Sequence, residues 1–228
     1  MQNLKYHAIL FDMDGVLVDS TACVERHWYA WTARHGLDFA QIMAISHGQR
    51  AIDTMKAVAS ALDLDLEREA LLFEQGQARD LEGIVAMPGA LELVTALPPE
   101  CWAIVTSATL PMAGARLEAI GLPFPRVFVT AEEVSQGKPH PEGYLKAAEL
   151  LGALPRECLV IEDAPAGIQA AHNGDIRVLA VATTFPAEKL QAADFVTAGL
   201  HTVHLSASQA QEQHLPWLHL SYELVGQI

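Results

Sequence analysis

The chain has 228 residues, 51% of them hydrophobic, with 28 acidic and 14 basic residues and a formal net charge of −14. This length and composition suit a globular protein of one large domain or two small ones, and exclude a disordered chain. The acidic balance argues against nucleic-acid or anionic-membrane binding, which need basic patches.

The cysteines and the distribution of apolar residues indicate the cellular compartment. Cys23, Cys101 and Cys158 are widely spaced with no CxxC pair, which favours a reducing compartment and no zinc site. Asp12 and Asp14 interrupt the apolar segment nearest the N-terminus, and no apolar run approaches the ~20 residues of a membrane span. We therefore expect a soluble, cytoplasmic protein that acts as a monomer.

The first predicted element is the apolar run at residues 8–11, typical of a short strand buried on both faces. It leads into Asp12 and Asp14, which are two residues apart and so face the same side of an extended chain. Gly15 then permits a sharp turn. Two carboxylates this close repel each other, and a divalent or other cationic partner relieves that repulsion.

The next segment, residues 19–84, is predicted to be helical. Its first helix is capped by Asp19 or Ser20, and apolar residues at helical spacing predict further helices over 51–62 and 66–81. Because no convincing strand interrupts it, we read this segment as a second domain inserted after the first strand.

From residue 85 onward, strands alternate with helices. The predicted strands are 103–105, 127–129, 159–161, 178–181 and 195–197. The helices between them are 91–97, 111–120, 142–151 and 166–172. Such alternation predicts an α/β fold with a parallel sheet covered by helices on both sides. The segment after Gln209 receives no assignment.

Polar side chains gather at the ends of these predicted strands and in the loop 136–141. In chain order they are Asp12, Asp14, Thr106, Ser107, Lys138, Glu162 and Asp163. The carboxyl ends of parallel strands share one sheet edge, so these residues converge there. Each has an ordinary alternative on its own, such as a strand-end hydroxyl, a solvated lysine or a helix cap. Chance would have to supply the right residue at every strand end, so a shared function is favoured.

This set suits phosphoryl transfer, which needs positioning and charge neutralisation. Asp12 can attack phosphorus to form an aspartyl-phosphate, and Asp14 can protonate the leaving alcohol and later take a proton from water. A Mg²⁺ ion can be held by Asp12, the backbone carbonyl of Asp14, and Asp163. Lys138 and Thr106, with Ser107 beside it, are the predicted phosphate-binding residues.

Four motifs resemble those of the haloacid dehalogenase-like superfamily in order and spacing. They are FDMDGVLVDS, AIVTS, GKPHPEGYLKAAELLG and VIEDAPAGI. Within that superfamily the chain is similar to the sugar-phosphatase branch, near the glycerol-3-phosphate and 2-deoxyglucose-6-phosphate phosphatases. The resemblance implies a Rossmann-like parallel core, residues 1–18 and 85–228, with a helical cap inserted at 19–84.

The same resemblance implies roles for individual residues. Asp12 is expected as the nucleophile and Asp14 as the acid/base. Mg²⁺ is expected to bind through Asp12, Asp14 and Asp163, with Glu162 as a further acid at the metal site.

The cap loop His47, Gly48, Gln49 and Arg50 is the predicted substrate-selecting segment. Arg50 can bind a second oxygen-rich part of a substrate, and Gly48 allows close approach. The alternative is an ordinary loop at a helix start, in which Arg50 pairs with an acid on the cap surface.

The leading hypothesis is a Mg²⁺-dependent phosphatase for a small phosphorylated sugar or polyol. One alternative is a sugar-phosphate mutase on the same scaffold. Val24 stands where the related β-phosphoglucomutases have a histidine, and it cannot donate a hydrogen bond, although Arg50 does match a mutase cap arginine. A dehalogenase is disfavoured because Asp14 and the acidic pair at 162–163 suit a metal and a leaving alcohol. A non-catalytic binding protein of the same fold is disfavoured by the complete residue set.

Overall fold

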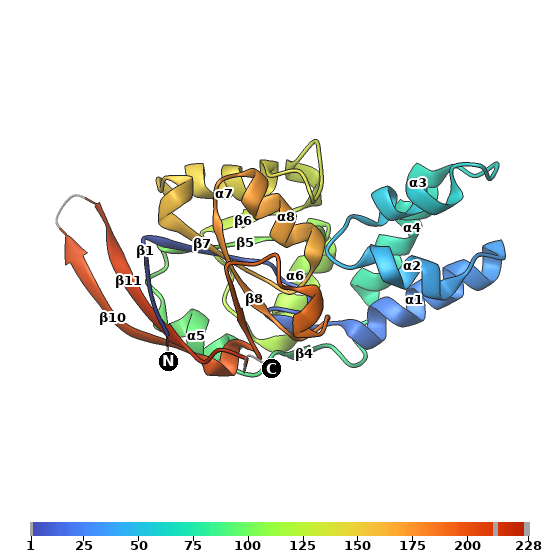
Figure 1. The fold of residues 1–228 in the computed structure, drawn as a ribbon. Helices are drawn as coiled ribbons and strands as arrows, with labels where there is room; N and C mark the ends of the chain where they lie inside the picture. Colours follow the sequence, from blue (N-terminus) through green and yellow to red (C-terminus); the bar gives the residue numbers. More distant parts are fainter. Residues whose placement is uncertain (1, 212–213, 226–228) are drawn as a thin grey trace.

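The computed structural model describes the backbone of residues 2–211 and 214–225, and within these ranges the side chains outside 206–215. The chain forms an α/β core with a helical cap on one side and a smaller antiparallel sheet on the other (Figure 1). Among the described residues, no helix is both long and apolar enough to cross a membrane. The α/β class expected from the sequence is confirmed.

The core is a parallel sheet whose central strand carries the first motif. In spatial order its strands are β6 (Val127–Val129), β5 (Trp102–Val105), β2 (Ala8–Phe11), β7 (Cys158–Glu162), β8 (Arg177–Val181) and β9 (Phe195–Thr197). Phe11, at the end of β2, pairs with Ile104 of β5 and Ile161 of β7. The residues that follow these strands therefore emerge side by side at one edge.

Helices cover both faces of the sheet, which explains why its strands read as continuous apolar runs. They are α5 (Ala90–Ala96), α6 (Leu110–Ile120), α7 (Glu142–Leu151) and α8 (Pro165–Asn173). Ile9 and Phe11 pack in the cluster that includes residues of α5 and α6. Ala8 and Leu10 face the opposite cluster, with α7 and α8.

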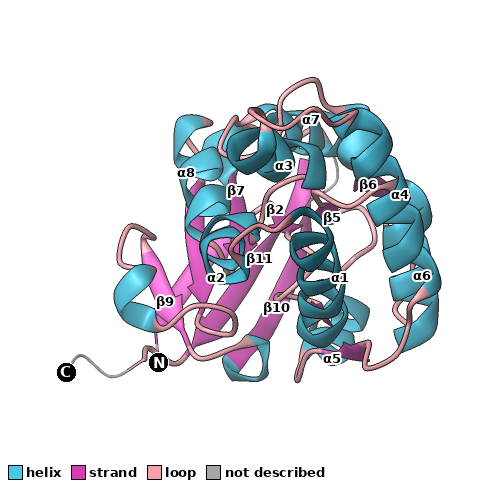
Figure 2. Cartoon of the chain, turned by 90° about the vertical axis from the view of Figure 1, so that its right-hand side faces the viewer, coloured by secondary structure: helices cyan, strands magenta, loops and turns pink. Residues whose placement is uncertain are grey.

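The inserted segment forms a bundle with its own apolar core (Figures 1 and 2). Its helices are α1 (Thr21–His35), α2 (Phe39–Ser46), α3 (Ala51–Ala59) and α4 (Leu66–Arg79). Trp28 and Trp31 are buried in this cluster. Two chain crossings join the bundle to the core, and they pair with each other as the short strands β3 (Val18–Asp19) and β4 (Val85–Ala86).

Two features of the fold were not anticipated. One is the β3–β4 ribbon, and the other is an antiparallel sheet in the order β1-β11-β10. Its strands are β1 (Gln2–Tyr6), β11 (His214–Tyr222) and β10 (Val203–Gln211). Leu4 pairs with Leu220 and Tyr6 with Leu218, and all four side chains join the core cluster. Short 3₁₀ turns occur at Ala131–Glu133, Pro155–Glu157, Ala187–Lys189 and Leu200–Thr202.

Candidate active site

A buried lysine joins the carboxylates that end two neighbouring strands. Lys138 Nζ lies 2.9 Å from Asp12 Oδ1 and 2.6 Å from Glu162 Oε1, and all three side chains are buried. Burial disfavours the charge on Lys138, but Asp12 and Glu162 outweigh it and raise the pKa of the ammonium. Lys138 is therefore a fixed positive charge beside Asp12. It is not the solvated loop lysine that the sequence allowed as the alternative.

Glu162 is occupied by donors on both of its carboxylate oxygens. Oε1 accepts from Lys138 and from the hydroxyl of Tyr144 at 3.0 Å. Oε2 accepts from the backbone N–H groups of Asp163 and Ala164, each at 2.8 Å. A carboxylate with four such donors is oriented toward Lys138 and the backbone, so its contacts suit a residue that positions Lys138.

Asp163 is pressed against the loop that follows Asp12. Gly15 has φ +80°, and a Cβ built on it would lie 2.0 Å from Asp163 Oδ2, so only glycine permits this approach. Burial, together with the carboxylates of Glu162 and Asp12, raises the pKa of Asp163 well above its usual value. Carboxylate oxygens of Asp12, Glu162 and Asp163 come within 4.8 Å of one another.

This donor set fits a hard divalent cation. Lys138 supplies one positive charge against three buried carboxylates in the described part of the chain, and close carboxylates repel unless a cation neutralises them. Carboxylate oxygens at such spacing are ligands that Mg²⁺ accepts. Asp12 and Asp163 are the members whose oxygens would hold the ion, since Glu162 already has its donors.

The strand-end hydroxyls have different neighbours. Thr106 is buried beside the acidic group, and its Oγ1 accepts from the backbone N–H of Ala108 at 3.0 Å. Ser107 Oγ donates to the carbonyl of Gly48 in the cap at 2.8 Å. Ser107, predicted to bind phosphate, thus contacts the cap loop through its hydroxyl in this arrangement.

Asp14 has a partner that the sequence did not suggest. Arg116 of α6 donates from Nη1 to Asp14 Oδ1 at 2.7 Å and from Nη2 to Gln77 Oε1 of α4 at 2.5 Å. Arg116 is 1% exposed, whereas the side chain of Asp14 is 29% exposed.

A hollow between cap and core collects most of these residues. On the core side it is lined by Asp12, Asp14, Thr106, Arg116 and Asp163. On the cap side it is lined by Val24, Trp28, His47, Phe73, Glu74 and Gln77. Burial lowers the pKa of His47, whose ring meets Phe185 edge-on at 5.5 Å. The hollow therefore has acidic side chains that could bind a cation on its core side, and a mixture of apolar and polar side chains on its cap side.

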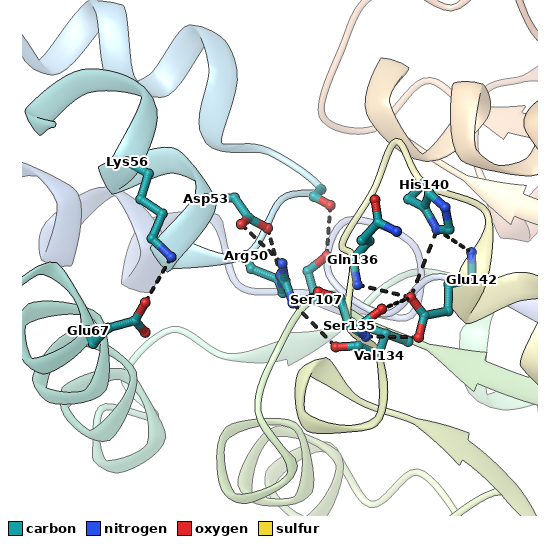
Figure 3. Close-up of polar contacts among 11 residues, drawn as sticks. Arg50, Asp53, Lys56, Glu67, Ser107, Val134, Ser135, Gln136, His140 and Glu142 are labelled. Atoms are coloured by element: carbon teal, nitrogen blue, oxygen red, sulfur yellow. Dashed lines mark hydrogen bonds and ion pairs between the residues drawn. The ribbon is translucent and has the colours of Figure 1, made fainter.

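Arg50 lies outside this hollow, in the contact between cap and core shown in Figure 3. Its Nε donates to Asp53 Oδ2 at 2.6 Å and its Nη2 to Asp53 Oδ1 at 3.1 Å. Nη1 reaches the carbonyls of Val134 and Ser135, both at 3.4 Å. The geometry matches the alternative in which Arg50 pairs with a cap acid, and adds a contact to the loop that leads to Lys138.

A model of the haloacid dehalogenase-like hydrolase family matches residues 6–175 of this chain. The chain belongs to this family. It is similar to hexitol phosphatase A of Escherichia coli, at 42% identity over 88% of this chain and 94% of that protein. It is also similar to glycerol-1-phosphate phosphohydrolase 2 of Saccharomyces cerevisiae, at 31% identity over 96% and 93%. A hydrolase structure from Pseudomonas syringae superposes with a TM-score of 0.76, at 28% identity, covering 85% of this chain and 94% of that one.

Sequence reasoning missed several residues of the site, among them Arg116, Gln77 and Tyr144. Each lies inside a helix and not at a predicted strand end. An isolated polar residue in a helix is ordinarily interpreted as solvent-exposed. Tyr144 lies within the third family motif, six residues after Lys138, and that spacing was the one available signal.

Gly167 offers a test of the Glu162 contacts. A Cβ at Gly167 would lie 1.6 Å from Glu162 Oε1, so Gly167→Ala should displace Glu162 and the lysine that it holds. We expect a loss of about 1–3 kcal/mol in the free energy of unfolding and at least a tenfold fall in kcat/KM. Urea unfolding and phosphate release measure the two effects.

The matched control is Gly114→Ala in α6, where the new Cβ would meet Phe124 at an ordinary 3.8 Å. It should stabilise the protein by about 0.5–1 kcal/mol through helix propensity alone. Equal behaviour of the two variants would refute the proposed contact.

Arg50→Ala should weaken docking of the cap on the core. Because Arg50 contacts Asp53 and two core carbonyls, we expect kcat/KM to fall about tenfold for every substrate, including p-nitrophenyl phosphate. Lys56→Ala, which breaks only the exposed pair with Glu67 seen in Figure 3, is the control and should stay within about twofold. A loss confined to sugar phosphates would instead place Arg50 on the leaving group.

Proposed function

We propose that this chain is a Mg²⁺-dependent phosphatase that hydrolyses small phosphorylated sugars or polyols through an aspartyl-phosphate on Asp12. One observation carries the proposal. The buried Asp12 carboxylate, bound by Lys138, opens on the same hollow as Asp14 and Asp163. The phosphatase names of the relatives from Escherichia coli and Saccharomyces cerevisiae support the same reaction class.

The reaction divides into two displacements at phosphorus. First, an Asp12 oxygen attacks the phosphorus, the bond from phosphorus to the alcohol oxygen breaks, and Asp14 gives its proton to that oxygen. Water then attacks the phosphorus of the aspartyl-phosphate, Asp14 takes a proton from the water, and Asp12 is released with inorganic phosphate. Lys138, which contacts Asp12, and Thr106, which lines the hollow, would bind the phosphoryl oxygens, with Lys138 held by Glu162.

Asp12 and Asp163, with the backbone carbonyl of Asp14, are the groups that would hold Mg²⁺. When bound, the ion neutralises charge on the phosphoryl group and on the carboxylates.

The cap determines which alcohol fits. Trp28 and Phe73 supply apolar surface, while Glu74 supplies a carboxyl group that can bind hydroxyls. Burial raises the pKa of Glu74 to about 7, with Glu132 adding to the rise and Arg50 opposing it. We propose that 19–84 is the cap, that 1–18 with 85–228 is the core, and that the pair acts as a cytoplasmic monomer on a free metabolite, without nucleic acid or membrane.

The decisive experiment is a panel of phosphorylated sugars and polyols incubated with purified protein and Mg²⁺, with inorganic phosphate as the readout. β-Glucose 1-phosphate belongs in the panel, because a phosphatase gives glucose and phosphate from it. Glucose 6-phosphate appearing faster than phosphate, with a bisphosphate primer present, would favour the mutase. No turnover of any phosphate ester would favour a binding protein.

A further inference from the structure

Arg116 is a buried charge that connects the core to the cap. Its side chain is 1% exposed, and a buried guanidinium is costly unless it is paired. It donates to Asp14 at 2.7 Å and to Gln77 at 2.5 Å, and Gln77 is itself buried. In the described residues its Nε is buried without a hydrogen-bond partner. One planar group therefore ties the proposed acid/base to helix α4.

We propose that Arg116 is a positioning residue that orients the Asp14 carboxylate only when α4 of the cap lies against α6 of the core. This inference rests on the proposed function, because it assigns a partner to the acid/base of that reaction. A guanidinium acts only as a hydrogen-bond donor, so Arg116 neither gives nor takes the protons that Asp14 transfers.

Two features support orientation as the role. Asp14 lies on the loop between β2 and β3, and its side chain is 29% exposed toward the hollow, so a fixed donor is needed to hold one rotamer. Val24, on the cap helix that lines the same hollow, has no donor to offer.

The link to the cap follows from Gln77. The β3–β4 ribbon carries the two chain connections between cap and core, and separation of α4 from α6 would remove Gln77 from Arg116. Nη2 would then lose its acceptor and turn to solvent, so the guanidinium would no longer be held at both of its ends. When the cap is closed over a substrate, the Arg116 guanidinium is therefore fixed by Gln77, and it in turn fixes the Asp14 carboxylate.

Two esters separate the steps that Asp14 serves. The alcohol of glycerol 1-phosphate needs a proton as it leaves, whereas p-nitrophenolate leaves as a stable anion. Water attack in the second step needs Asp14 with either ester. Loss of Arg116 should therefore slow both steps with glycerol 1-phosphate. With p-nitrophenyl phosphate it should slow only the second step.

The experiment measures rapid-mixing kinetics of Arg116→Lys, Arg116→Ala and Gln77→Ala. With p-nitrophenyl phosphate, the Arg116 variants should release about one equivalent of p-nitrophenolate in a burst, followed by turnover about a hundredfold slower than wild type. With glycerol 1-phosphate, kcat should fall about a hundredfold with KM within about threefold and no burst of glycerol. Gln77→Ala should show the same pattern at about a tenfold loss.

The controls are Arg79→Ala and Gln75→Ala, which remove exposed side chains from α4 and should stay within about twofold of wild type. If Arg116→Ala fails to fold, Gln77→Ala and Arg116→Lys decide the question. A rise in KM for glycerol 1-phosphate with unchanged kcat would make Arg116 a substrate contact and overturn the proposal, as would variants that match the controls. Inactive wild-type protein would refute the proposed function and this inference with it.

Discussion

Asp12→Asn should abolish turnover while leaving the fold intact. The amide keeps the size of the carboxylate but cannot attack phosphorus, so we expect kcat to fall at least about a thousandfold, roughly 4 kcal/mol of barrier. Lys138 keeps Glu162 as a partner at 2.6 Å, which limits the structural cost. Phosphate release and the thermal midpoint Tm are the measurements. A variant with a tenth of the wild-type rate would show that Asp12 is not the nucleophile.

Asp19→Asn is the matched control, because Asp19 accepts a hydrogen bond from the Thr21 N–H and does not line the hollow. It should keep wild-type kinetics.

Partition to an added alcohol tests the covalent step in the wild-type protein. A shared aspartyl-phosphate must divide between water and glycerol in the same ratio whichever ester formed it. A ratio that changes with the leaving group would mean direct attack by water.

The convergence of the catalytic set could be predicted because it follows from topology. Asp12, Thr106 and Asp163 each follow a buried strand, and a parallel sheet places such positions at one edge. Lys138 lies in a loop, where the sequence has no strand or helix periodicity. Its role was indicated by the family motif that begins with GKPHP. These positions carry their signal locally, in the residues around them.

Arg116 could not be predicted in this way, because its burial depends on α4 and α6 approaching each other across two domains. On α6 alone it reads as a solvated arginine. Two interpretations of Arg50 were open, and its contact partner Asp53 was visible in the sequence only as one acid among several.

The β1–β11–β10 sheet was missed for another reason. Apolar residues alternate at Leu4 and Tyr6, and again at Leu218, Leu220 and Tyr222, and these side chains are buried, but no strand was predicted for either segment. Their pairing joins the two ends of the chain, however, and no local pattern specifies a partner so distant in sequence.

Chelation of divalent ions should remove activity, and excess Mg²⁺ should restore it. Burial raises the pKa of Asp12, with Lys138 opposing the rise and Glu162 adding to it, so the uncompensated site disfavours the ionised nucleophile. A divalent cation beside Asp12 and Asp163 reverses that effect. Ca²⁺ should bind but support little turnover, because it prefers a larger and looser ligand shell. Full activity after exhaustive chelation would refute the metal requirement.

Binding of Mg²⁺ should also be visible without turnover, as a rise in Tm. At a concentration about a hundred times Kd, the stabilisation is about 2.7 kcal/mol, which for a chain of this size corresponds to a rise of roughly 5–10 °C. Asp163→Asn should abolish that rise. It should not lower the Tm of the metal-free protein, because it removes one of the carboxylates that repel each other within 4.8 Å. An Asp163→Asn variant that keeps the full Mg²⁺-dependent rise would place the ion elsewhere in the molecule.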